Sequence, residues 1–304
     1  MTKPTRTTTA LISSLTIIFL AFAIGRLSVT TNTPTTPTTI SSIRNDNGKT
    51  HHFHITTTTT ITHTVLIIGA TGRTGSLLYS ILKNEQPQII VRALVRNATK
   101  ARDVLHCTFC DERDGIYVGD VTHPPDLVRA ALGVDTLVIL AAAGMGNTIE
   151  EQKAIEFDAV VDSVVALGQE ANIGDGDDDL RVVLCSSMGT TRFSGDNFGQ
   201  ILFWKLNAEA FLASSGLGTT IVKPCGLTND AGGNATLLVG HHDSISINKD
   251  GNRYPVTRAD VAAVMAQAVV SRSEGLRFDL CSEPGPGTTD LDGLLEGSRW
   301  EWDR

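Results

Sequence analysis

The 304-residue sequence predicts an α/β protein: a doubly wound parallel sheet in a single domain, preceded by a disordered leader. Continuous aliphatic runs recur along residues 62–304, and segments with helical spacing lie between most of them. A glycine-rich turn follows the first run. Such runs are typical of strands buried on both faces of a sheet, and their alternation with helices implies right-handed βαβ units.

Residues 1–61 differ in composition from the rest of the chain. No acidic residue precedes Asp46, and an apolar run fills residues 10–25. A tract rich in Thr, Ser and Pro follows, and its low hydrophobic content predicts disorder. The basic start and apolar core predict a targeting segment joined to a linker. A retained membrane anchor is the alternative, although the apolar run is short for a span of about 20 residues.

The elements of residues 62–304 follow from their hydrophobic periodicity. The first expected strand covers residues 64–70 ("TVLIIGA"), and six further runs lie at residues 89–96, 115–120, 136–142, 181–187, 219–225 and 276–282. Helical spacing is found at residues 76–83, 126–132, 149–172, 204–214 and 260–271.

Net charge and cysteine usage exclude several classes of function. A formal charge of −8 and a pI near 5.5 argue against a nucleic-acid-binding surface, which would need a basic stripe. The five cysteines do not suggest a disulfide framework. Cys107 and Cys110 form one C-x-x-C without a second pair, so we expect a loop with two thiols. We assign no metal site, and we interpret the acidic residues 174–179 as an exposed loop.

The stretch "GATGRTG", residues 69–75, has the properties of a dinucleotide-binding loop. It follows a buried strand and opens a helix, at the first βα turn of the alternating pattern. Gly69 permits a tight turn, Gly72 lets the backbone approach a diphosphate, and Gly75 lets the helix pack closely against the strand. The free N–H groups of the helix would then face the anion. Thr71, Arg73 and Thr74 complete the predicted loop contacts.

The end of the second strand predicts NADP(H) as the cofactor. An NAD site usually has an acidic residue there, which binds the ribose 2′-hydroxyl. This chain has Arg96, followed by Lys100 and Arg102, and Arg73 in the glycine loop could reach the same point. A basic cluster suits the 2′-phosphate of NADP. The alternative is an ordinary solvated basic face.

Two further strand ends contribute expected contacts. Asp120, with Val121 beside it, places an acceptor where an adenine amino group could lie. Ala141 and Ala142 leave room for the cofactor to pass, although small residues there could also be plain packing.

Several motifs together resemble the atypical short-chain dehydrogenase/reductases with an NAD(P)-binding Rossmann fold. They include "GATGRTG", "LVRN", "VVLCSSMG", "FWKLNAEAFLASSGLGTTIVKPCGLTND" and "VTRADVAAVM". The nearest groups are the NmrA-like, biliverdin/flavin reductase-like, and plant and algal NAD(P)-binding proteins. The resemblance covers residues 65–282.

The resemblance implies catalytic residues, and one of them is missing. The family uses a Ser after the fifth strand and a Tyr-x-x-x-Lys pair, in which the Tyr transfers the proton. Ser186 and Ser187 follow the fifth expected strand; Ser187 is expected to act in catalysis and Ser186 to lie beside the cofactor. Lys205 matches the Lys and is expected to hold the ribose. Ile201 stands at the Tyr position, and residues 118–253 contain no tyrosine.

The proton donor and the substrate pocket can be placed only broadly from the sequence. A substrate proton could come from solvent, from Lys205 itself or from a histidine such as His241, although an ordinary structural role is the favoured interpretation of His241 and His242. The substrate pocket is expected around Met145, Met188 and residues 224–229, with Pro224 beside the cofactor.

Two functions remain open. The first is an NADPH-dependent oxidoreductase of a small acceptor that needs little acid catalysis, such as a flavin, a quinone or a conjugated double bond. The second is a non-catalytic NADP(H)-binding factor that senses redox state or assists assembly of a partner protein complex. The leader and the resemblance together suggest a plastid, with membrane anchoring or the secretory pathway as the alternative. Neither function involves nucleic acid, and only the N-terminal segment would contact a membrane.

Overall fold

A computed structural model of the protein describes residues 38–44, 50–56, 63–170, 180–192, 195–245 and 255–300. The expected acidic loop at 174–179 lies outside the described residues. The chain divides into two compact units, Met1–Thr60 and Ile61–Arg304. None of the helices that the structure describes is both long enough and apolar enough to cross a membrane.

In the first unit, two segments of the Thr-rich leader pair as strands. β1 (Thr38–Arg44) and β2 (Thr50–Thr56) run antiparallel, with Ile40 opposite His54. Both strands are rich in β-branched residues, which favour extended backbone.

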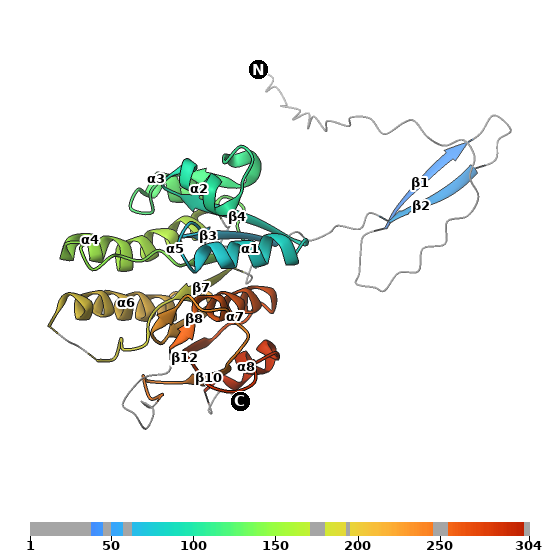
Figure 1. The fold of residues 1–304 in the computed structure, drawn as a ribbon. Helices are drawn as coiled ribbons and strands as arrows, with labels where there is room; N and C mark the ends of the chain where they lie inside the picture. The colour runs from blue at the N-terminus through green and yellow to red at the C-terminus, as the bar shows by residue number, and fades with distance from the viewer. Residues whose placement is uncertain are drawn as a thin grey trace, which may run out of the picture. The chain divides into compact units, whose positions relative to one another are not determined.

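The second unit is built on one eight-stranded sheet with the strand order β10-β12-β8-β7-β6-β3-β4-β5 (Figure 1). The strands are β3 (His63–Ile68), β4 (Ile89–Val95), β5 (Ile116–Val118), β6 (Thr136–Ile139), β7 (Arg181–Cys185), β8 (Gly218–Pro224), β10 (Thr236–Gly240) and β12 (Leu276–Glu283). Only β10 is antiparallel to its neighbour among these strands. The seven parallel strands are those expected from the aliphatic runs, so the predicted doubly wound sheet is confirmed. β9 (Leu227–Thr228) and β11 (Val256–Thr257) form a separate short parallel pair.

The helices include all five segments that the periodicity predicts. They are α1 (Gly75–Glu85), α2 (Ala98–Leu105), α3 (Pro124–Ala131), α4 (Ile149–Lys153), α5 (Ala159–Glu170), α6 (Asn197–Ser214), α7 (Arg258–Val270) and α8 (Leu291–Gly297). The expected helix at 149–172 is interrupted by a π-helical turn, η2 (Ala154–Asp158), between α4 and α5. A short 3₁₀ turn, η1 (Glu112–Asp114), precedes β5. α2 and α8 were not expected from the sequence.

Two hydrophobic layers enclose the sheet. Along β3, Val65 and Ile67 contact the layer that contains α1, α2 and α7, whereas Leu66 and Ile68 contact the layer of α3, α5 and α6. All four side chains are almost completely buried. Because alternate side chains of a strand point to opposite faces, an uninterrupted aliphatic run is what a strand between two helical layers requires. The carboxyl end of β3 is thereby fixed at the edge of the sheet.

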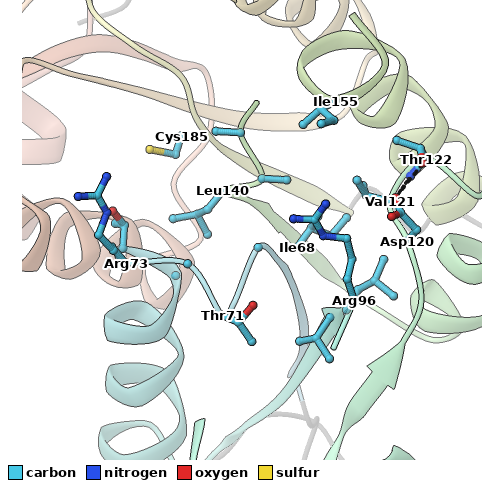
Figure 2. A pocket seen from close by; sticks show the side chains of 18 of the residues that line it. Ile68, Thr71, Arg73, Arg96, Asp120, Val121, Thr122, Leu140, Ile155 and Cys185 are labelled. Carbon is cyan, nitrogen blue, oxygen red and sulfur yellow. Dashed lines mark hydrogen bonds between the residues drawn. The ribbon is translucent and has the colours of Figure 1, made fainter. Parts of the chain in front are cut away.

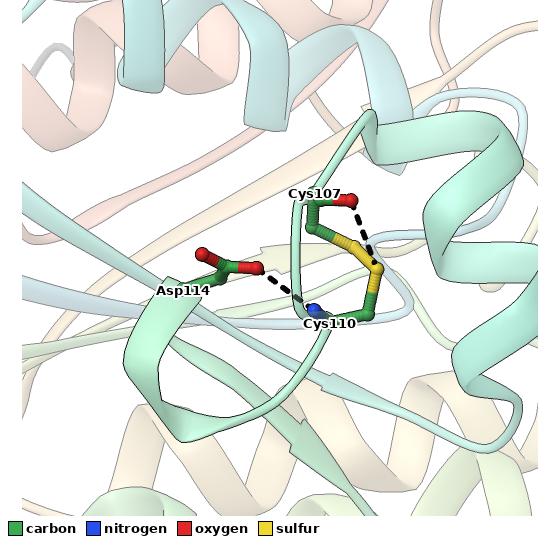
Figure 3. Close-up of side chains that lie close together, drawn as sticks. All are labelled: Cys107, Cys110 and Asp114. Carbon is green, nitrogen blue, oxygen red and sulfur yellow. Dashed lines mark hydrogen bonds between the residues drawn. A yellow bond between two sulfur atoms is a disulfide. The ribbon is translucent and has the colours of Figure 1, made fainter.

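The C-x-x-C loop differs from the expectation. Cys107 and Cys110 form a disulfide with their Cα atoms 5.0 Å apart (Figure 3). Asp114 supports this loop, because its Oδ2 accepts the backbone N–H groups of Phe109 at 2.5 Å and Cys110 at 2.8 Å. The expectation of two free thiols was wrong, because the turn after α2 brings the two cysteines to bonding distance.

A second cysteine pair joins neighbouring strands. Cys225 and Cys281 are bonded, with their Cα atoms 5.2 Å apart, just beyond the paired residues Pro224 of β8 and Leu280 of β12. Cys185 is the free cysteine. Sequence spacing gives no sign of this pairing, because 56 residues separate its members.

Candidate functional site

A cavity of about 680 Å³ opens at the carboxyl edge of the sheet, around the point where the strand order reverses between β3 and β6 (Figure 2). This is where ligands bind in doubly wound sheets. Of the residues expected from the sequence, those that line the cavity are Gly69, Thr71, Gly72, Arg73, Thr74, Gly75, Arg96, Asp120, Val121, Ala141, Ala142, Ser186, Ser187 and Lys205.

The glycine loop makes a tight turn that a side chain would block. Gly69 has φ +90°, and a Cβ atom there would lie 2.7 Å from the backbone nitrogen of Ala141. A Cβ atom at Gly75 would collide with the carbonyl oxygen of Gly69. The turn is closed by the N–H of Gly72, which donates to the carbonyl of Gly69 at 2.9 Å. Helix α1 therefore starts directly against the end of β3.

The start of α1 is suited to an anion. Thr74 occupies the N-cap position, and its side chain makes no capping hydrogen bond. The first N–H groups of a helix have no partner within the helix, and the helix dipole is positive at this end. A diphosphate group can accept hydrogen bonds from these N–H groups and place its negative charge at the positive end of the dipole. The loop therefore fits the central part of a dinucleotide.

Arg96 and Asp120 mark one end of the cavity (Figure 2). Arg96 follows β4, and Lys100 from the first turn of α2 lines the same cavity. Asp120 accepts the backbone N–H of Thr122 at 2.9 Å and its hydroxyl at 2.8 Å. These bonds, the backbone one foremost, together with the charge of Arg96 hold the pKa of Asp120 below its ordinary value, so the carboxylate stays ionised.

Arg73 lies away from this basic end. Figure 2 places its side chain on the far side of the glycine loop from Arg96. There the charge of Arg73 acts on Arg258, the first residue of α7, which also lines the cavity. The expectation that Arg73 reaches the same point as Arg96 was wrong, because the side chain of Arg73 lies on the Cys185 side of the glycine loop and that of Arg96 on the Asp120 side (Figure 2).

Lys205 forms an ion pair that the sequence did not reveal. Its Nζ lies 2.7 Å from Oε2 of Glu156, and both side chains are almost completely buried. The other oxygen of Glu156 accepts the backbone N–H of Ala143 at 2.7 Å. Glu156 lies in the π-helical turn η2, a type of distortion that is frequent at functional sites. Burial lowers the pKa of Lys205, but Glu156 more than offsets this, so the pKa is raised and the ammonium stays charged.

The two serines after β7 have different surroundings. The hydroxyl of Ser186 donates to Glu209, a buried residue that also accepts Nε of Arg277 at 2.9 Å. Ser186 is therefore engaged with the interior of the domain. The hydroxyl of Ser187 donates only to the carbonyl of Met188, at 3.0 Å, among the contacts described. Ser187 is thus the hydroxyl more readily available to a ligand.

The position of the usual tyrosine is apolar and closed. Ile201 is 5% exposed and does not line the cavity. Cys185 does line it, but burial raises the pKa of this thiol to about 11, so it remains neutral. Ile201 therefore supplies no acid, and Cys185 is a neutral, protonated thiol at neutral pH.

Several expected substrate contacts lie elsewhere. Pro224 is buried at the end of β8, where its carbonyl accepts the N–H of Met188 at 2.9 Å. Met188 is buried against cysteine sulfur atoms, whereas Met145 is 57% exposed. His241 contacts a backbone carbonyl near the opposite edge strand. None of these four residues lines the cavity; of residues 224–229, Leu227 does. The expected place of Pro224 beside the cofactor was therefore wrong.

Comparison with known proteins agrees with this site. A family model described as NAD(P)H-binding matches residues 69–272. The chain is 33% identical over 245 residues to an uncharacterised chloroplastic protein of Arabidopsis thaliana, covering 75% of this chain and 73% of that protein. It is 31% identical over 269 residues to sanguinarine reductase of Eschscholzia californica, covering 76% of this chain and 94% of the reductase. A solved NAD-dependent epimerase/dehydratase from Bacillus halodurans is 24% identical with a TM-score of 0.62, covering 77% of this chain and 99% of that one.

Proposed function

The chain belongs to the NAD(P)H-binding family of atypical short-chain dehydrogenase/reductases, and we propose that it is an NADPH-dependent oxidoreductase of a small acceptor. One observation carries the proposal: a single cavity joins the glycine loop, the basic end at Arg96 and the buried cation Lys205. These are the groups that a dinucleotide phosphate and its reactive ring would need along one extended molecule.

The charges at the end of β4 support NADPH over NADH. Arg96 occupies the position where an NAD site has an acidic residue, and Lys100 adds a second cation. A planar guanidinium can form two parallel hydrogen bonds to a phosphate, which a ribose hydroxyl cannot match.

The chain's own groups suit an acceptor that needs little acid catalysis. A bound nicotinamide cofactor supplies or accepts a hydride. Lys205, held protonated by Glu156, can donate a hydrogen bond to a ribose hydroxyl but gives up its proton reluctantly. Ser187 can orient an acceptor oxygen through its hydroxyl. A flavin, a quinone or a conjugated double bond fits this set, because its reduced form can take a proton from water.

The test is NADPH oxidation by the purified protein against a panel of flavins, quinones and enones. We expect turnover with at least one class and its loss in Gly69→Val, where a side chain would collide with the turn at Ala141. If the protein binds NADPH yet oxidises it with none of the panel, the oxidoreductase proposal fails.

The buried Ile201 in place of a tyrosine favours a second candidate. In that case the protein binds NADP(H) without turnover and acts as a redox sensor or as an assembly factor for a partner complex. Binding of NADPH without acceptor reduction, together with co-purification of a partner that depends on NADPH, would support it.

We further propose that the protein acts in a plastid. The support is the leader, which has no acidic residue before Asp46, together with the chloroplastic designation of the Arabidopsis relative. Microscopy of a fusion between residues 1–61 and a fluorescent reporter tests this. Fluorescence confined to the cytosol or to the secretory pathway would contradict it.

A further inference from the structure

Arg258 is a buried cation without a carboxylate partner in the part of the chain that the structure describes. It is 9% exposed, and it begins α7 beside the cavity. Its Nη1 donates to the carbonyl of Leu227 at 3.3 Å and to Oδ1 of Asn229 at 2.7 Å. Both acceptors are neutral, so they fix the direction of the guanidinium without balancing its charge. Burial of a charge is costly unless a counter-ion accompanies it.

A second cation faces the same part of the cavity. Arg73 projects from the glycine loop, and no ion pair involves it among the described residues. Burial, and then the neighbouring charge of Arg73, lowers the pKa of Arg258. Both guanidinium groups are positively charged and line the same cavity, so an anion bound there would balance both charges and offset the cost of burying Arg258.

The two arginines are separate from the basic end formed by Arg96 and Lys100. Figure 2 shows Arg73 towards Cys185, at the end of β7, and Arg96 towards Asp120, on the other side of the loop. The cavity thus has two cationic regions, and one 2′-phosphate can neutralise only one of them.

We propose that Arg73 and Arg258 form an oxyanion-binding subsite, which takes a carboxylate or phosphate group at the β7 side of the cavity. The inference rests on the proposed function, because it assigns this subsite to the same cavity. Two sources can supply the oxyanion. One is the cofactor's own diphosphate; the other is an acidic group on the substrate, which would make the substrate an anion.

Phosphorus NMR titration of inorganic phosphate tests the subsite directly. The titration is done in the full chain carrying Arg96→Gln, so that the other cationic region contributes little. We expect that adding Arg258→Gln or Arg73→Gln weakens phosphate binding about tenfold or more, since charge-assisted hydrogen bonds contribute roughly 1.5–3 kcal/mol. Arg129→Gln, an exposed α3 residue outside the cavity lining, is the matched control and should leave the affinity unchanged.

Two further measurements with NADP⁺ distinguish the two sources of the oxyanion, the cofactor's diphosphate and an acidic substrate. If wild-type protein saturated with NADP⁺ still binds phosphate in an Arg258-dependent way, the subsite takes an acidic substrate. If NADP⁺ excludes phosphate and Arg258→Gln also weakens NADP⁺ binding, the subsite holds the cofactor's diphosphate.

Phosphate affinity that is unchanged by both substitutions would overturn the proposal. Arg73 is exposed on a loop, so Arg73→Gln keeps the test decisive even if Arg258→Gln fails to fold. Because the readout is binding, a lack of turnover with flavins, quinones and enones would contradict the proposed oxidoreductase and leave this result standing.

Discussion

Lys205 Nζ lies 2.7 Å from Glu156 Oε2, in a buried ion pair that joins α6 to the π-helical turn after α4. The pair explains how a lysine can stay charged inside the cavity, because Glu156 is its counter-ion. Lys205 therefore also stabilises the packing of α6 against the π-helical turn, besides any contact with the cofactor.

Lys205→Ala should have two separable effects. NADPH binding should weaken by about 1.5–3 kcal/mol, the scale of a charge-assisted hydrogen bond. The free energy of unfolding should fall by about 3–5 kcal/mol, because Glu156 is left as an unpaired buried charge. The double variant Lys205→Met/Glu156→Gln should recover most of the stability and none of the affinity. Calorimetry and urea unfolding measure the two effects; unchanged NADPH affinity in Lys205→Ala would remove this residue from the site.

A second buried cluster contains two aspartates, Asp243 and Asp279, whose contributions to stability should depend on pH in opposite directions. Lys223 lies 3.0 Å from Asp243 and 3.1 Å from Asp279, and all three side chains are fully buried. Burial opposes ionisation of Asp243, but the N–H of Gly189 and further hydrogen bonds outweigh it, so its pKa is lowered. Burial and the charge of Asp243 raise the pKa of Asp279, despite Lys223. One cation therefore faces two carboxyl groups of unequal tendency to ionise.

Asp243→Asn should cost about 3 kcal/mol or more of stability at neutral pH, because Lys223 loses its ionised partner. Asp279→Asn should cost much less. The pH dependence of stability distinguishes the two substitutions further. The contribution of Asp243 is present above its ordinary pKa of 3.8 and is lost as the pH falls through its lowered value. The contribution of Asp279 to stability is present below its ordinary pKa of 3.8. It is lost as the pH rises through the raised pKa of this residue in the folded protein.

Asp279→Asn should therefore flatten the decline in stability between acidic and neutral pH, whereas Asp243→Asn should not. Thermal unfolding across this range measures it. Equal losses from the two substitutions at every pH would contradict the assignment.

The disulfide between Cys107 and Cys110 predicts a pattern of alkylation. Unfolded, unreduced protein treated with iodoacetamide should carry the label on Cys185 and not on Cys107 or Cys110. After reduction, both should be labelled. Peptide mass spectrometry reads the pattern, and Cys110→Ser is the control, since it should release Cys107 for labelling without reduction. Full labelling of both cysteines before reduction would show that the loop holds two thiols.

The boundary between leader and fold gives another test. A protein that starts at Thr60 retains the whole unit Ile61–Arg304, including β3 and every residue that lines the cavity. It should be soluble, unfold cooperatively and bind NADPH with the affinity of the full chain. Loss of binding in the shortened protein alone would place the boundary earlier.

The sheet and the glycine loop could be predicted because each depends on a local pattern. Aliphatic runs mark strands buried on both faces, and Gly69 and Gly75 are needed where a Cβ atom would meet backbone. α2 was missed because its sequence, "ATKARDVL", is short and buries only Ala101 and Leu105, which are too few apolar positions to establish a helical period. β10 lies at the edge of the sheet and runs against its neighbour, so nothing in the parallel βαβ pattern points to it.

The site was less predictable because its charges meet through tertiary packing. Glu156 lies in the middle of an expected helix, and only the π-helical turn and the approach of α6 bring it to Lys205. Arg258 is 185 residues from Arg73 along the chain, and only the packing of α7 beside α1 brings the two to one cavity. The prediction for Pro224 failed because the carbonyl of this strand end accepts the N–H of Met188 from the neighbouring loop and does not face the cavity.

We expect the cavity to bind NADPH in preference to NADH, chiefly through Arg96. Titration of both cofactors into the wild-type chain and into Arg96→Asp measures this preference. Charge-assisted contacts to a phosphate contribute roughly 1.5–3 kcal/mol, or about one to two decades of affinity. The wild type should therefore bind NADPH more tightly by this factor. In Arg96→Asp the preference should invert, with NADPH affinity falling far more than NADH affinity, because aspartate repels the 2′-phosphate and accepts a 2′-hydroxyl. Equal wild-type affinities for the two cofactors, or a variant that loses both alike, would show that the basic cluster around Arg96 is only a solvated face.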